Sequence, residues 1–184
     1  MTSWLGQEQR EFSPADTETG GDGARSFAHA PALVLGFGNV LLSDDGAGIQ
    51  LLGRVRSELG DAAADFVDAG TLSFSLLNYV EATHSMLVFD AADLGCVPGT
   101  VCLFEDAAMD RFLASSRRRT VHEVGLIDLL DMARLQDCLP SRRALLCIQP
   151  ERIDWSEMLS APVAAALPEA GRKAAALLRQ WQSA

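Results

Sequence analysis

The chain has 184 residues, of which 48% are hydrophobic and 22% are charged, and its formal net charge is −10. That length and composition suffice for one globular domain with a sizeable core. The negative charge argues against nucleic acid and anionic membranes as partners, and leaves cations, metal ions and basic protein surfaces open.

We expect neither a secretory signal nor a membrane span. The first thirty residues lack the apolar core of a secretory signal, and no apolar run is long enough to cross a bilayer. Cys96, Cys102, Cys138 and Cys147 have no CxxC spacing, which indicates reduced core residues rather than a zinc site or disulfide framework. We therefore expect a soluble, cytoplasmic protein.

The chain divides into a polar N-terminal segment and a patterned remainder. Residues 1–30 are rich in Gly, Ser, Thr, Asp and Glu, which predicts a flexible tail before a single domain over residues 31–184. The apolar run 33–35 predicts a buried strand, and a Gly-rich turn follows it. Residues 47–59 then have helical spacing, and Gly60 would end that helix.

Two further strands each end at an acidic residue. The first covers residues 66–67 and ends at Asp68. The second covers residues 86–89, is apolar on both faces as in the centre of a parallel sheet, and ends at Asp90. A short helix over residues 74–80 is predicted between them.

The second half of the chain continues the alternation of strands and helices. After the turn at Pro98-Gly99, residues 100–104 predict an edge strand antiparallel to the strand before it. Pro168 would kink or restart the terminal helix. The remaining predicted elements are helices over 107–113, 122–133 and 161–181 and a strand over 145–148. This order predicts an α/β fold, a three-layer α/β/α arrangement whose sheet is mostly parallel with one antiparallel edge.

Four polar residues fall at one edge of this predicted sheet: Asp45, Asp68, Asp90 and His122. Parallel strands with right-handed crossovers bring such positions together. A histidine at a helix N-terminus stays neutral and able to bind metal, because the helix dipole disfavours its cation. Carboxylates with an imidazole suit a divalent first-row metal.

Structural alternatives exist for three of these residues. Asp45 could be only a helix N-cap, and Asp68 could be a turn residue that bonds its own backbone. A single histidine such as His122 at a helix start is more often structural than a ligand. Asp90 is harder to explain in this way, since an acid directly after an apolar strand is usually paired or functional.

The turn Gly36-Phe37-Gly38 raises the alternative of dinucleotide binding. The third glycine of that fingerprint is replaced by Leu41, and the adjacent carboxylates Asp44 and Asp45 would repel pyrophosphate. The match therefore fails.

The run GFGNVLLSDDGAG, residues 36–48, resembles the opening motif of the hydrogenase maturation endopeptidases. These enzymes trim the C-terminal extension from the large-subunit precursor of nickel–iron hydrogenases. The resemblance continues through DAGT, LVFDA, PGT, HEVGL and QPE, which begin at residues 68, 87, 98, 122 and 149. It covers the chain from about residue 33 to the C-terminus and leaves out only the tail.

The resemblance implies a twisted five-stranded sheet and a metal site formed by Asp45, Asp90 and His122. Asp45 is a glutamate in many members of the family. The metal would be nickel carried by the precursor, or another divalent ion in isolation, and it would polarise the scissile carbonyl directly or through water. Asp68 and Asp44 would orient a ligand or a water beside these three residues.

The expected partner is the nickel–iron hydrogenase large-subunit precursor, and we expect the protein to be a monomer. A non-catalytic metal-sensing or chaperone-like module that docks this precursor is the alternative from another functional class.

Overall fold

The computed structural model describes residues 32–70, 76–115 and 121–183, and of residues 121–124 it describes the backbone only. The strands of its single five-stranded sheet are β1 (Ala32–Phe37), β2 (Ala64–Gly70), β3 (Ser85–Ala91), β4 (Val101–Glu105) and β5 (Arg142–Ile148). The helices are the 3-10 helix η2 (Ser43–Gly46), α1 (Ala47–Leu59), α2 (Leu77–Glu81), α3 (Ala107–Ser115), α4 (Val121–Leu135) and α5 (Ala161–Gln182).

The strand order is β2-β1-β3-β5-β4, and every pairing is parallel except that of β4 with β5. The predicted α/β class with one antiparallel edge is thereby confirmed. The predicted partner of the edge strand is wrong, because β4 pairs with β5 and not with β3. Both edges of β3 are taken by parallel partners, so the outer edge of β5 is where β4 pairs.

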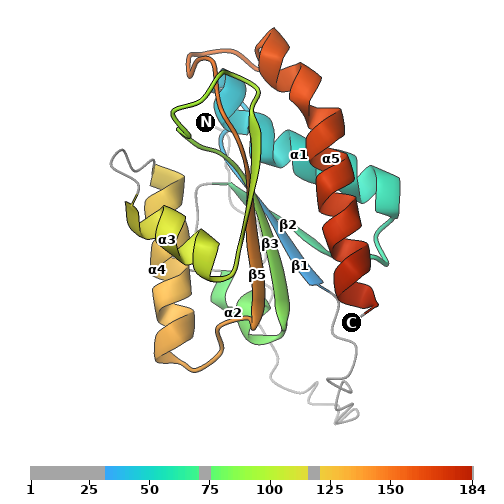
Figure 1. Ribbon diagram of the computed structural model, residues 1–184, viewed down its shortest axis with the longest axis vertical. Coiled ribbons are helices and arrows are strands. Elements are labelled where there is room, and N and C mark those ends of the chain that lie inside the picture. Colours follow the sequence, from blue (N-terminus) through green and yellow to red (C-terminus); the bar gives the residue numbers. More distant parts are fainter. Residues whose placement is uncertain (1–31, 71–75, 116–120, 184) are drawn as a thin grey trace, which may run out of the picture.

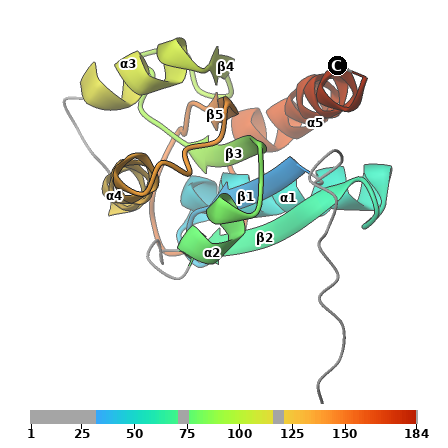
Figure 2. The same ribbon diagram turned by 90° about the horizontal axis from the view of Figure 1, so that it is seen from below.

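Helices cover both faces of the sheet (Figure 1). The helices α1 and α5 pack on one face, and α2, α3 and α4 pack on the other. Figure 2 shows α4 and α5 on opposite sides of the strands. Because side chains alternate along a strand, Met86 and Val88 of β3 enter one core, and Leu87 and Phe89 enter the other.

Most helix boundaries follow the sequence pattern. Helix α1 ends at Leu59, and Gly60 after it has φ +80°, a conformation that glycine adopts without strain. Pro168 lies inside α5 and does not start a new helix, in contrast to one of the two predicted outcomes. The predicted tail and the start of the predicted helix at 74–80 lie outside the described residues.

The cysteine prediction is only partly correct. All four thiols are free, but Cys147 alone is buried, while Cys102 and Cys138 are half-buried and Cys96 is exposed. Cys96 lies in the loop after β3, where a side chain can face solvent without leaving a cavity. In the described part of the chain, none of the helices combines the length and apolar character that a membrane crossing requires.

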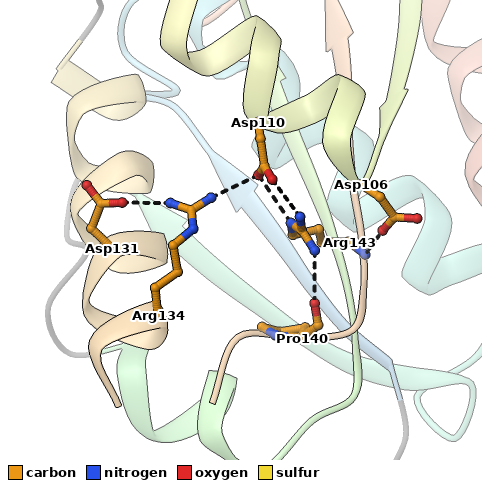
Figure 3. A network of polar contacts seen from close by, with 6 residues as sticks. All are labelled: Asp106, Asp110, Asp131, Arg134, Pro140 and Arg143. Atoms are coloured by element: carbon orange, nitrogen blue, oxygen red, sulfur yellow. Dashed lines mark hydrogen bonds and ion pairs between the residues drawn. The ribbon is translucent and has the colours of Figure 1, made fainter. Parts of the chain in front are cut away.

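A charged network ties α3, α4 and β5 together (Figure 3). The Asp110 carboxylate accepts hydrogen bonds from Arg143 Nη2 at 2.5 Å and from Arg134 Nη2 at 3.0 Å. Hydrogen bonds from Arg143 lower the pKa of Asp110; burial opposes them, and the charges of both arginines lower it further. The pKa of this carboxyl therefore lies below its ordinary value.

The Asp110→Asn substitution is expected to lower the free energy of unfolding by about 1–2 kcal/mol at neutral pH. Because the folded state lowers the pKa of Asp110, this stabilisation is complete above about pH 4 and is lost as the pH falls through the folded pKa. Urea unfolding of both proteins at neutral pH and at about pH 3 measures the difference. Asp61→Asn is the control, since the Arg56–Asp61 pair is solvent-exposed and its loss should not be measurable. A difference between Asp110→Asn and the parent that is independent of pH would contradict the prediction.

Candidate active site

The loop after β1 folds back over the end of that strand. Gly38 has φ +131°, and a Cβ on it would overlap the carbonyl oxygen of Asp45. Its N–H donates to the carbonyl of Gly70 at the end of β2, at 3.2 Å. The close neighbour of this glycine is thus the chain's own η2 backbone, which explains the Gly-rich turn without a nucleotide.

Gly48 lets the first turn of α1 lie directly on two strand ends. A Cβ at this position would overlap the carbonyl oxygens of Phe37 and Phe89, the last residue of β1 and a residue near the end of β3. The helix η2, immediately before α1, contacts β3. Glycine at residue 48 thereby brings Asp45 toward the strand end that bears Asp90.

We expect Gly48→Ala to lower the free energy of unfolding by at least about 2 kcal/mol, because the added methyl group meets backbone that cannot move independently. Gly53→Ala in the same helix is the matched control, since a Cβ there meets nothing within 4 Å. It should stabilise the protein by about 0.5–1 kcal/mol. Urea unfolding of both variants tests the pair, and equal effects would contradict the assigned packing.

Asp45 is a nearly buried carboxylate, 5% exposed, in η2. Its Oδ2 accepts a hydrogen bond from the N–H of Asn39 at 3.0 Å. The N-cap alternative is wrong, because the N-cap of α1 is Gly46 and that cap has no side-chain hydrogen bond. Asp45 is therefore held by the loop that precedes it.

Asp90 is the second nearly buried carboxylate, 3% exposed, at the penultimate position of β3. Its Oδ1 accepts a hydrogen bond from the N–H of Ala91 at 2.8 Å. Since β1 and β3 are parallel, with Gly36 opposite Phe89, their carboxyl ends lie at one edge of the sheet. Asp45 and Asp90 are consequently brought to the same end of the fold, as predicted.

His122 lies in the first turn of α4, which begins at Val121. Helix α4 leads into the amino end of β5, so its own N-terminus lies toward the carboxyl ends of the parallel strands. The side chain of His122 is outside the described part of the structure. Among the residues that the structure describes, no group of three His, Cys, Asp or Glu could hold a metal ion, and the three-residue site stays a prediction.

Asp68 bonds its own backbone, as its structural alternative stated, but it lies within a strand and not in a turn. It is an exposed residue within β2, and its Oδ1 accepts a hydrogen bond from the N–H of Gly70 at 2.8 Å. Strand β2 extends two residues beyond the predicted end, so Asp68 does not terminate it. The sequence pattern placed the end of this strand too early because Ala69 and Gly70 resemble a turn.

Asp44 binds the loop between β5 and α5. It is fully buried, at 0% exposed. Its Oδ2 accepts hydrogen bonds from the N–H groups of Glu151 and Arg152 and from Ser160 Oγ, at 2.8, 3.1 and 2.8 Å. Its Oδ1 accepts one from Ser160 N–H at 2.6 Å.

These bonds determine the charge of Asp44. Burial alone would raise the pKa of this carboxyl, but the bonds from Ser160 and from the two other backbone N–H groups outweigh it. The pKa of Asp44 is therefore below its ordinary value, and the side chain is a carboxylate. The structure shows that Asp44 anchors a distant loop, and its expected role beside the metal ligands stays a prediction.

A family model described as hydrogenase maturation protease matches residues 50–176. The chain belongs to this family. It is 34% identical over 151 residues to the hydrogenase expression/formation protein HoxM of Cupriavidus necator, covering 81% of this chain and 74% of that protein.

Solved structures of maturation proteases share the fold. The hydrogenase maturating endopeptidase HybD from E. coli superimposes with a TM-score of 0.74 at 26% identity, covering 82% of this chain and 93% of that one. The [NiFe] hydrogenase maturation protease HybD from Thermococcus kodakarensis gives a TM-score of 0.69 at 28% identity, covering 80% and 99%.

Gln149, directly after β5, binds the loop that follows β3. Its side chain is largely buried, and Oε1 accepts hydrogen bonds from the N–H groups of Leu94 and Cys96 at 2.7 and 3.3 Å. It thereby holds the loop that follows Asp90. The QPE motif was the available signal, but the sequence alone did not indicate which loop Gln149 would bind.

Proposed function

We propose that this maturation protease removes the C-terminal extension from the nickel-loaded large-subunit precursor of a nickel–iron hydrogenase. Membership in the family and the likeness to the HybD endopeptidase of E. coli support the reaction. The observation that carries the site assignment is the pair of nearly buried carboxylates, Asp45 and Asp90, at one end of the sheet.

In this proposal Asp45, Asp90 and His122 hold the nickel ion that the precursor carries. Two carboxylates and an imidazole suit a divalent first-row metal, and His122 lies in the first turn of α4. When bound, the ion polarises the scissile carbonyl. The chain's own contribution is orientation: the N–H of Asn39 holds one oxygen of Asp45, and the N–H of Ala91 holds one oxygen of Asp90.

The same proposal places the reaction in the cytoplasm and assigns it to a monomer. Four free thiols are typical of a reducing compartment, which supports the location. Light scattering on the purified protein measures its molar mass in solution and so tests whether it is a monomer.

The test is an assay of purified protein with nickel-loaded precursor, read by intact mass. The precursor should lose its C-terminal extension with multiple turnovers, and nickel-free precursor should remain intact. Binding without shortening would contradict the proposal and favour a chaperone-like module. In cells that lack the protein, the large subunit that keeps its extension identifies the substrate.

A further inference from the structure

Five exposed apolar side chains gather on two loops beside the candidate active site. Trp155 is 83% exposed and Met158 is 74% exposed. Tryptophan and methionine side chains are usually at least partly buried in a folded protein. We call this set the apolar rim; it comprises Val40, Leu41, Ile153, Trp155 and Met158. Aromatic residues and methionine are enriched where proteins bind other proteins.

The two loops of the rim form one surface although they are far apart in sequence. Leu42 and Ser156 form a parallel β-bridge. The N–H of Ser43 donates to the carbonyl of Ser156 at 2.6 Å, and the N–H of Ser156 donates to the carbonyl of Leu41 at 3.1 Å. Ser43 Oγ donates to the carbonyl of Met158 at 3.1 Å. These bonds order the backbone of both loops and leave the apolar side chains outside.

The rim is continuous with the carboxylate site through two adjacent residues. Asp44 anchors the second loop through Ser160 and two further N–H groups, and Asp45 is bonded to Asn39 in the first loop. One short segment therefore supports both the rim and a candidate ligand. Because the loops are already ordered, a partner that binds the rim would lose little entropy in arranging them.

We infer that the apolar rim binds an apolar surface of the large-subunit precursor next to the extension that is cleaved. This inference rests on the proposed function. A peptidase must hold its protein substrate where the bond is cut, and the rim adjoins the candidate site. An exposed ion pair between Arg152 and Asp154, at 3.7 Å, lies in the same loop, and protein interfaces likewise combine apolar with charged side chains.

The test compares the Trp155→Ser/Met158→Ser double variant with the parent. The rate of trimming is measured against precursor concentration, and binding of labelled precursor is titrated separately. We expect the Kd and the half-saturating concentration to rise about tenfold or more, with the maximal rate nearly unchanged. Equal values for the two proteins, or a loss confined to the maximal rate, would overturn the inference.

Leu135→Ser is the matched control, because Leu135 is 85% exposed and ends α4 at the opposite end of the parallel strands. It should leave the Kd and the maximal rate unchanged, and all variants should keep the parent's thermal midpoint. An equal loss of binding in Leu135→Ser would overturn the assignment of the surface.

The binding titration separates this inference from the proposed function. A protein that binds precursor without cutting it refutes the function, while the double variant still tests the rim. A protein that neither binds nor cuts overturns both. Light scattering that finds a dimer for the parent and a monomer for the double variant would overturn the inference and assign the rim to a second copy of this chain.

Discussion

Replacing Asp90 with asparagine is expected to slow precursor trimming by about 10²–10³-fold. Asparagine keeps an oxygen that can accept the hydrogen bond from Ala91, so the end of β3 should be preserved. It removes the negative charge and an anionic ligand from a position that is 3% exposed. His122→Ala should cause a comparable loss. The measurement is the rate at which the extension disappears from nickel-loaded precursor, followed by intact mass.

The matched control for this prediction is Asp93→Asn. Asp93 is three residues further along the chain, is exposed, and accepts a hydrogen bond from the N–H of Gly95 at 3.2 Å. The control should trim precursor at the parent's rate. If Asp90→Asn trimmed as fast as the parent, Asp90 would have no place in the reaction. If both variants were equally slow, the effect would belong to the loop and not to the carboxylate.

Asp44→Ala is expected to lower the free energy of unfolding by about 3–5 kcal/mol. The substitution leaves the N–H groups of Glu151, Arg152 and Ser160 without their acceptor, and it leaves a cavity in place of a fully buried carboxylate. Urea unfolding at neutral pH measures the loss.

The control for Asp44→Ala is Asp61→Ala, whose carboxylate pairs with Arg56 in solvent and should contribute no measurable stability. Faster proteolysis of residues 151–160 in Asp44→Ala than in the parent, under native conditions, would identify the released loop. A variant as stable as the parent would show that Asp44 does not anchor this loop.

The secondary structure was largely predictable, because it depends on local periodicity. The helical spacing over residues 47–59 and the glycine after it predicted α1 to the residue. The apolar runs predicted the buried strands β1, β3 and β5, and their order along the chain predicted the layers. The pairing of β4 was missed because local pattern does not say which strand edge is unoccupied.

The site was predictable only in part. Asp45 and Asp90 were correctly placed at one end of the sheet, because parallel strands have a common direction. The role of Asp44 and Asp68 beside the metal ligands stays a prediction; the structure shows that Asp44 bonds the loop before α5 and that Asp68 bonds its own backbone. Neighbouring side chains in a tight turn such as η2 diverge, so adjacent carboxylates need not serve the same site.

By itself, the sequence determined the α/β class, the positions of most helices and strands, and a resemblance that the family match confirmed. Only the tertiary structure decided which carboxylate faces which loop, and that two apolar loops form one surface. The physical reason is distance along the chain. Asp44 bonds to Glu151 and Ser160 across separations of 107 and 116 residues, and no local pattern encodes such contacts.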